Sequence, residues 1–223
     1  MPKDTPSYGA LVNLLSGHGL VPRGGFYPTE EDEVPGLPAT LVMVGNVGST
    51  MWESYERLPS DVCDPLDQWS KSALDAVAGE VGATALYPFG GPPYLPFQRW
   101  AQKAEPVSPS PLGILIHPEY GLWHAYRGAL AFADELDLPP PDRRASPCNS
   151  CTGKPCLSAC PVGAFGADGY DVPGCVSHLR TQAGEDCVRL GCRARRSCPV
   201  GRSYTYAPRQ AAFHMHAFLR ANG

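Results

Sequence analysis

Cysteine is distributed very unevenly along this chain of 223 residues. Eight of its nine cysteines lie between Cys148 and Cys198, and only Cys63 stands apart. In a small secreted protein such clustering predicts disulfides, whereas in a cytosolic protein it predicts a metal site. The N-terminal run MPKDTPSYGALVNLLSGHG has neither the basic start nor the apolar segment of a signal peptide, and no long apolar stretch follows. We therefore expect a cytoplasmic protein whose C-terminal part is organised by metal and which does not act at a membrane.

The first four clustered cysteines have a spacing close to that of bacterial ferredoxins. They occupy the run CNSCTGKPCLSACP, which reads C-x2-C-x4-C-x3-C-P. The ferredoxin pattern is C-x2-C-x2-C-x3-C-P, and its fourth cysteine binds the other cluster of the pair. The extra residues here lengthen one loop over the edge of a cluster. The four are Cys148, Cys151, Cys156 and Cys160.

The second four cysteines are more widely spaced but end in the same way. Both groups finish in Cys-Pro-Val-Gly, at residues 160–163 and 198–201. This parallel ending predicts an exchange in which the last cysteine of each group binds with the other group. One 4Fe-4S cluster would then be held by Cys148, Cys151, Cys156 and Cys198, and the other by Cys175, Cys187, Cys192 and Cys160.

Two other interpretations use the same cysteines. Structural zinc sites also take sets of four thiolates, and an oxidised chain would form disulfides. The Cys-Pro endings and the small residues in C-x3-C favour an iron-sulfur turn over a zinc knuckle. A broad, reducible absorption band in anaerobically purified protein distinguishes clusters from colourless zinc.

Charge is polarised along the chain. Up to Pro140 there are 7 Lys and Arg against 17 Asp and Glu, and from Pro141 onward there are 11 against 5. Many of the C-terminal arginines lie between cysteines, where an anionic metal-thiolate cluster needs positive charge nearby. No aromatic and basic motif of a known nucleic-acid reader accompanies them, so we expect no nucleic-acid partner.

The N-terminal half alternates predicted helices with predicted strands. Thr50-x-x-Glu53 is a capping box for a helix through Leu58. Asp64-Pro65 opens a longer helix with a buried stripe, and the Gly-, Pro- and acid-rich segment 22–38 reads as a solvated loop. The apolar stripe consists of Leu66, Trp69, Ala73, Val77 and Val81. Other helices are expected over 8–15 and 97–103, and strands over 39–44, 84–87 and twice within 113–130.

These patterns predict an α+β chain of two domains. The run PPPDRRASP marks a boundary near residue 140. We expect an α/β sandwich domain over 1–140 and a small ferredoxin-like domain with two 4Fe-4S clusters over 141–223.

The cysteine domain resembles the cluster domain of epoxyqueuosine reductase. CVSHL at 175–179, the later Gly191-Cys192 and the terminal Cys-Pro carry the likeness. Cys187 departs from it, because the family's remaining cysteine lies downstream of the Gly-Cys pair. The resemblance implies a cobalamin-dependent enzyme in which two 4Fe-4S clusters feed electrons to cobalt.

The stretch GILIHPEYGLWHAYRGAL, residues 113–130, resembles the cobalamin-processing CblC family. That family has a strand of the type G-x-x-I-H-P, followed by an aromatic residue, Gly, Trp and an Arg-Gly pair. PATLVMV with Met51 nearby, and DPLDQW at 64–69, extend the likeness over roughly residues 35–135. The resemblance implies a nitroreductase-like fold that binds cobalamin with its nucleotide tail displaced and removes the upper axial ligand. Matching residues are Gly113, Ile116, His117, Pro118, Tyr120, Gly121, Trp123, Arg127 and Gly128.

The expected cobalamin pocket is drawn from this stretch. A corrin is a large, mostly apolar disc with amide arms, which suits aromatic walls and a few directed polar groups. Aromatic walls would come from Tyr120, Trp123 and Tyr126, beside Gly121, and polar contacts from His117 and Arg127. In CblC proteins the arginine matching Arg127 helps to hold a glutathione thiol. Each residue also has a structural interpretation: a capped strand end for His117, ordinary core for Trp123 and an ion pair for Arg127.

The leading hypothesis joins the two resemblances. Two 4Fe-4S clusters would receive electrons from an unidentified donor and pass them to bound cobalamin, whose axial ligand is then released by decyanation or dealkylation. The alternatives are a cobalamin-dependent reductase of an organic substrate and a ferredoxin-like carrier without cobalamin. A substrate reductase would need a general acid, for which Tyr94, Glu119 and Asp134 are candidates. His214 and His216 on a C-terminal helix, and Cys63, are expected to be structural.

Overall fold

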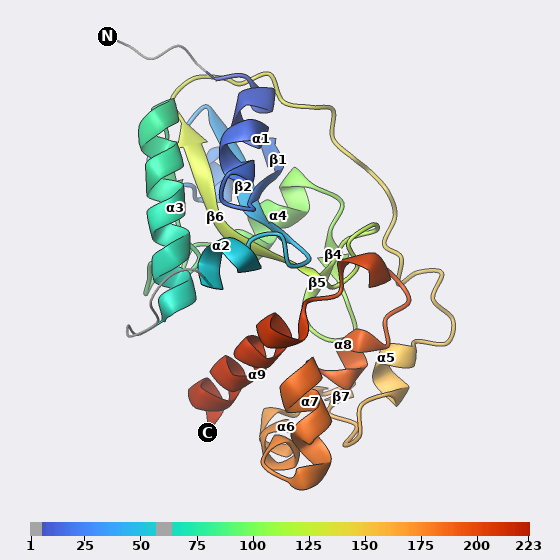
Figure 1. Cartoon of the computed structure of the whole chain (residues 1–223). Helices are drawn as coiled ribbons and strands as arrows, with labels where there is room; N and C mark the ends of the chain where they lie inside the picture. The colour runs from blue at the N-terminus through green and yellow to red at the C-terminus, as the bar shows by residue number, and fades with distance from the viewer. Residues whose placement is uncertain (1–5, 57–63) are drawn as a thin grey trace. The chain divides into compact units, whose positions relative to one another are not determined.

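The computed structural model describes residues 6–56 and 64–223, which form two compact units (Figure 1). The first unit comprises the chain up to Pro106 together with His124–Arg143, and the second comprises Val107–Trp123 with Arg144–Gly223. The predicted boundary near residue 140 differs from this division in one respect. Residues 107–123 lie with the cysteine-rich part instead of the N-terminal part, because their apolar side chains pack against its cysteines.

The first unit is a mixed α/β structure built on a four-stranded antiparallel sheet in the order β1-β2-β6-β3. Every residue of β2 is buried, so the centre of the sheet is covered on both faces. The helix α3 packs on β6 and β3, while α4 and α1 pack on β1. The strands are β1 (Val21–Phe26), β2 (Thr40–Val47), β3 (Thr84–Leu86) and β6 (His124–Phe132), and the helices are α1 (Tyr8–Ser16), α2 (Trp52–Glu56), α3 (Pro65–Val81) and α4 (Phe97–Ala104).

The helices of this unit follow the sequence patterns. The whole stripe predicted for α3 is buried, and the helix starts at Pro65 as expected. The capping-box helix is present as α2, although Leu58, its predicted end, lies outside the described residues. The prediction of a loop over 22–38 is wrong at its start, because β1 pairs with β2 along Val21–Phe26. An edge strand tolerates Pro22, and the register shifts between Pro22 and Gly25, which is why turn-forming residues concealed a strand.

The second unit has short elements and a core that includes sulfur. Leu112, Ile116 and Leu122 pack with Cys156 and Cys198 in one buried cluster. Its hairpins are small, and no helix in the described part of the chain is long and apolar enough to span a membrane. The elements are β4 (Ser108–Pro109), β5 (Leu115–Ile116), α5 (Pro155–Ser158), β7 (Phe165–Gly166), β8 (Gly169–Tyr170), α6 (Val172–Leu179), η2 (Gln182–Gly184), α7 (Glu185–Leu190), α8 (Arg193–Arg196), η3 (Arg202–Tyr204) and α9 (Pro208–Asn222).

The two Cys-Pro-Val-Gly turns share a backbone conformation but differ in their surroundings. Gly163 has φ +58° and Gly201 has φ +72°, a region that L side chains avoid. A Cβ atom on Gly163 would meet nothing within 4 Å, whereas one on Gly201 would overlap the backbone of Tyr120 and Gly121. The second turn therefore holds residues 107–123 against the cysteines by backbone contact.

Alanine substitutions separate these two effects. We expect Gly163→Ala to lower the free energy of unfolding by about 1–2 kcal/mol, the cost of placing a Cβ in the left-handed region. Gly201→Ala carries the same cost plus an overlap, so we expect a loss of at least about 3 kcal/mol. Urea unfolding of the two variants, prepared in the same metal-loaded state, measures the difference. Equal losses would contradict the docking of residues 107–123 on the second turn.

Candidate metal centres

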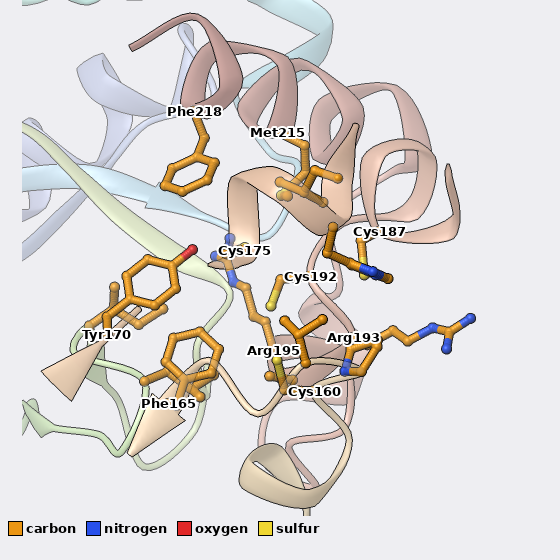
Figure 2. A pocket seen from close by; sticks show the side chains of 17 residues that line it. Cys160, Phe165, Tyr170, Cys175, Cys187, Cys192, Arg193, Arg195, Met215 and Phe218 are labelled. Atoms are coloured by element: carbon orange, nitrogen blue, oxygen red, sulfur yellow. The ribbon is translucent and has the colours of Figure 1, made fainter. Parts of the chain in front are cut away.

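One group of four cysteines surrounds a cavity of about 240 Å³ in the second unit (Figure 2). Cys175 lies on α6, Cys187 on α7 and Cys192 just before α8. Cys160 reaches the same cavity from the turn that follows α5. The negative charges of Cys160 and Cys187 act on Cys175, whose thiol pKa is raised first by burial and then by these neighbours. These four cysteines are called the second set below.

The other four cysteines form a separate group, the first set. Burial raises the pKa of the Cys148 thiol, and the negative charges of Cys198 and Cys156 raise it further. Cys151 acts in the same way on Cys198, so all four are electrostatic neighbours. Helices α5 and α8 pack together and bring Cys156 beside Cys198 in the buried core.

The last cysteine of each motif therefore lies with the other motif. Cys160 leaves the first run of cysteines and joins the second set, while Cys198 joins the first set. These are the two groups that the parallel Cys-Pro-Val-Gly endings predict. That each group binds a cluster stays a prediction.

Backbone amides point at several of the sulfurs. The Ala164 amide donates to Cys160 Sγ at 3.3 Å, and the backbone amides of Ala194 and Arg195 lower the pKa of the Cys192 thiol against the larger effect of burial. The backbone amide of Val200 likewise lowers the pKa of the Cys198 thiol, which burial raises. Such bonds favour the thiolate over the thiol, which is the form that binds metal.

The described cysteines form neither disulfides nor a site for a single metal ion. All eight described cysteines are free of disulfide bonds. Within residues 6–56 and 64–223, no three His, Cys, Asp or Glu side chains lie close enough together to bind one metal ion. Zinc holds its sulfurs about 2.3 Å from one centre, whereas a 4Fe-4S cluster spreads four thiolates over four irons.

His178 gives a second test of fit. It lines the cavity of the second set, and among the described residues its buried Nε2 has no hydrogen-bond partner. A buried polar nitrogen without a partner costs free energy unless an acceptor or a bound group occupies the cavity. The sulfurs of a cluster would supply such acceptors, so the residues present fit a 4Fe-4S cluster here.

Two arginines, Arg193 and Arg195, line the cavity of the second set. Arg193 and Arg196 both pair with Asp186 on α7. Arg195 lies over the rings of Trp123 and Tyr206, at 4.6 and 4.5 Å, and its Nε donates to the Leu122 carbonyl at 3.0 Å. The guanidinium of Arg195 thus joins residues 107–123 to α8 close to Cys192.

The predicted cobalamin-pocket residues are divided between the two units, and those in the second unit are engaged in its own packing. His117 Nδ1 accepts hydrogen bonds from the amides of Glu119 and Tyr120, and its ring stacks on that of Tyr120 at 4.1 Å. Trp123 is 2% exposed and contacts Tyr206 edge to face. Gly121 packs its backbone against Val200. These contacts are the ones expected if the His-Pro and Gly-Leu-Trp motifs serve packing within the second unit.

The remaining two pocket candidates, Tyr126 and Arg127, lie on β6 in the first unit. The Tyr126 hydroxyl donates to Glu105, whose carboxylate also pairs with Arg23 at 2.6 Å. Arg127 Nε donates to Asn46 Oδ1 at 3.1 Å, and the Arg127 residue is 8% exposed. Burial raises the pKa of Glu105, and the charge of Arg23 opposes this effect.

Sequence reasoning missed the partners in this polar group of the first unit. Arg23 and Asn46 are fully or almost fully buried, at 2% and 0% exposure. The signal was an arginine and an asparagine within apolar strands, VPRGGF and TLVMVGNV. Such residues are retained in a core only where they are paired, so they mark a built polar site.

The other candidates from the sequence do not gather into a site within either unit. Tyr94 is 67% exposed, and Glu119 accepts a hydrogen bond from Tyr204 at 2.8 Å. On α9, His214 contacts the Tyr206 ring while His216 is exposed. Cys63 lies outside the described residues.

Comparison with known proteins gives limited likeness. No protein-family model matches the chain, and no curated protein matches it. Among solved structures, epoxyqueuosine reductase from Streptococcus thermophilus is 17% identical, with a TM-score of 0.44, over 78% of this chain and 54% of that one. Epoxyqueuosine reductase with a tRNA-Tyr epoxyqueuosine-modified tRNA stem loop is 17% identical, with a TM-score of 0.45, over 86% and 65%. The matched region is thus about half to two thirds of those proteins, and the case for the metal centres rests on the cysteine geometry.

The exchange of cysteines is tested by combining substitutions. Anaerobic reconstitution of the unaltered chain should give about eight irons per chain, since each 4Fe-4S cluster holds four. Cys160→Ser should remove the second cluster, so adding Cys175→Ser should cost no more iron. Adding Cys148→Ser to Cys160→Ser should instead abolish iron binding.

The control for these variants is Cys63→Ser, which lies outside both sets and should retain all the iron. Iron and acid-labile sulfide are measured for each variant. If Cys160→Ser and Cys148→Ser were redundant with each other, each motif would bind its own cluster and the exchange would be wrong.

Proposed function

We propose that this chain is an iron-sulfur redox protein in which two 4Fe-4S clusters pass electrons to a cobalamin bound by the first unit. The observation that carries the proposal is the arrangement of eight cysteines in two sets linked by reciprocal exchange of Cys160 and Cys198. Two sets that share one small core are suited to transfer between neighbouring clusters. In this proposal the second unit is ferredoxin-like and the first is nitroreductase-like.

The cobalamin part of the proposal is supported by the CblC-like sequence of residues 35–135. It is also supported by the polar group that β6 carries in the first unit, where Tyr126 and Arg127 lie among buried partners. When bound, cobalamin supplies a cobalt whose reduction weakens its axial bond. The protein's own part would be to hold corrin amides through Arg127 and to exclude water from the reduced metal.

The division of the predicted pocket narrows the proposal. Trp123 is buried against Tyr206, and the half-buried Tyr120 contacts Tyr204, so both rings are engaged within the second unit and neither is proposed as a corrin wall. Their replacement should destabilise the cysteine-rich unit. Arg127 is the residue whose change tests cobalamin binding most directly, because it lies in the first unit and remote in sequence from every cysteine of the two sets.

The test titrates the reconstituted protein with hydroxocobalamin and follows the visible spectrum, then the electron paramagnetic resonance of base-off Co(II) after reduction. We expect a saturable spectral shift and retention of cobalamin on gel filtration. Arg127→Met should weaken binding about tenfold or more, since a charge-assisted hydrogen bond contributes about 1.5–3 kcal/mol. Arg99→Met is the matched control, because Arg99 is an exposed arginine of the same unit that pairs with Glu33.

Three outcomes would change the assignment. Clusters that reduce reversibly in a protein with no cobalamin affinity would make it a ferredoxin-like carrier. Cobalamin that binds permanently and is not altered would favour a reductase of an organic substrate. Binding of transfer RNA to the loaded protein would contradict our expectation of no nucleic-acid partner.

A further inference from the structure

We propose that Tyr170 sets the reduction potential of the second cluster through a hydrogen bond from its hydroxyl to the sulfur of Cys175. The inference rests on the proposed binding of a 4Fe-4S cluster by the second set. Tyr170 lies outside both cysteine motifs. Its proposed role is to change the reduction potential of the second cluster and not that of the first.

The position of Tyr170 is defined by its ring. It ends the short hairpin of β7 and β8, where it pairs with Phe165. Its ring stacks on Phe165 at 4.7 Å and on Phe218 of α9 at 6.0 Å, between centroids. Two aromatic contacts restrict the ring and so direct the hydroxyl along one line.

The Tyr170 hydroxyl is directed into the cavity of the second set. Tyr170 lines the cavity together with Cys175, and Figure 2 shows its hydroxyl directed toward that cysteine. Both side chains border this cavity, and the Tyr170 hydroxyl lowers the pKa of the Cys175 thiol, which is the effect expected of a donor to that sulfur. A phenol keeps its proton at neutral pH, so it remains a donor when the cysteine is a thiolate.

A donor at this place favours the reduced cluster. Reduction adds one negative charge that is shared with the ligand sulfurs, and a hydrogen bond to a sulfur stabilises the more negative state. The bond from Tyr170 therefore raises the reduction potential of the second cluster. A higher potential makes that cluster the preferred place for an electron within the pair.

The first set offers a matched comparison. The Ser146 hydroxyl accepts a hydrogen bond from Ser108 Oγ at 2.6 Å, and it lowers the pKa of the Cys148 thiol, as a donor to that sulfur would. An aliphatic hydroxyl is a weaker acid than a phenol, whose pKa is about 10, and so is the weaker donor. The two clusters thus receive hydroxyl donors of different strength, with the stronger at the second set.

The decisive variant is Tyr170→Phe, which keeps the ring between Phe165 and Phe218 and removes only the hydroxyl. Redox titration of the loaded protein, followed by electron paramagnetic resonance, gives the midpoint of each cluster. We expect the second midpoint to fall by the equivalent of about tenfold in the reduction constant, or ~59 mV for one electron. The first midpoint should not change.

Two further variants assign the effect. Ser146→Ala should lower the first midpoint alone and by less than Tyr170→Phe lowers the second. Tyr204→Phe is the control, because the Tyr204 hydroxyl donates to Glu119 and not to a sulfur. The two signals are assigned to their clusters by the one that disappears in Cys187→Ser.

The outcomes separate this inference from the function on which it rests. If the unaltered chain binds no cluster at the second set, the proposed function fails. If it binds both clusters and Tyr170→Phe leaves both midpoints unchanged, or moves them equally, the role of Tyr170 is overturned while cluster binding stands.

Discussion

The second unit depends on the exchange of one cysteine between its two motifs. Cys160 and Cys198 each leave their own run of chain and join the other set, so neither set is complete without both motifs. A local loop around one metal would fold independently of the rest. Here the first set extends from before α5 to after α8, and the four cysteines of the second set all lie between its first and last members, so the two sets are interleaved along the chain.

The same turns explain the stretch that resembles a cobalamin-processing protein. GILIHPEYGLW belongs to the second unit, where its apolar residues cover the cysteine core and Gly121 touches the second Cys-Pro-Val-Gly turn. HAYRGAL continues as β6 in the first unit. One continuous sequence motif therefore contributes to two folded units. The contacts of its first half do not tell which residues its second half contacts.

Local signals predicted the structure well, and partners remote in sequence were not predictable. The stripe of α3 and the grouping of the cysteines follow from spacing within one element or from a repeated ending. The packing of Trp123 could not be predicted from such local signals. It depends on Arg195, which lies over its ring and donates to Leu122, 73 residues away in the sequence, and no periodicity encodes a pair so far apart. The strand β1 was concealed by Pro22 and the glycines beside it, and the burial of Arg23 there depends on Glu105, which lies 82 residues away.

Residues 107–123 belong to the second unit but are synthesised before most of it, which affects the order in which the chain can fold during synthesis. All strands of the first sheet are present once Phe132 has left the ribosome, so that sheet can close early. Leu112, Ile116 and Leu122 have by then been made, but their cover at Cys156 and Cys198 has not. The apolar side chains of residues 107–123 therefore stay exposed to solvent until Cys198 and the turn that follows it have been synthesised. Packing of the C-terminal cysteines on these residues then ends the exposure of the apolar surface.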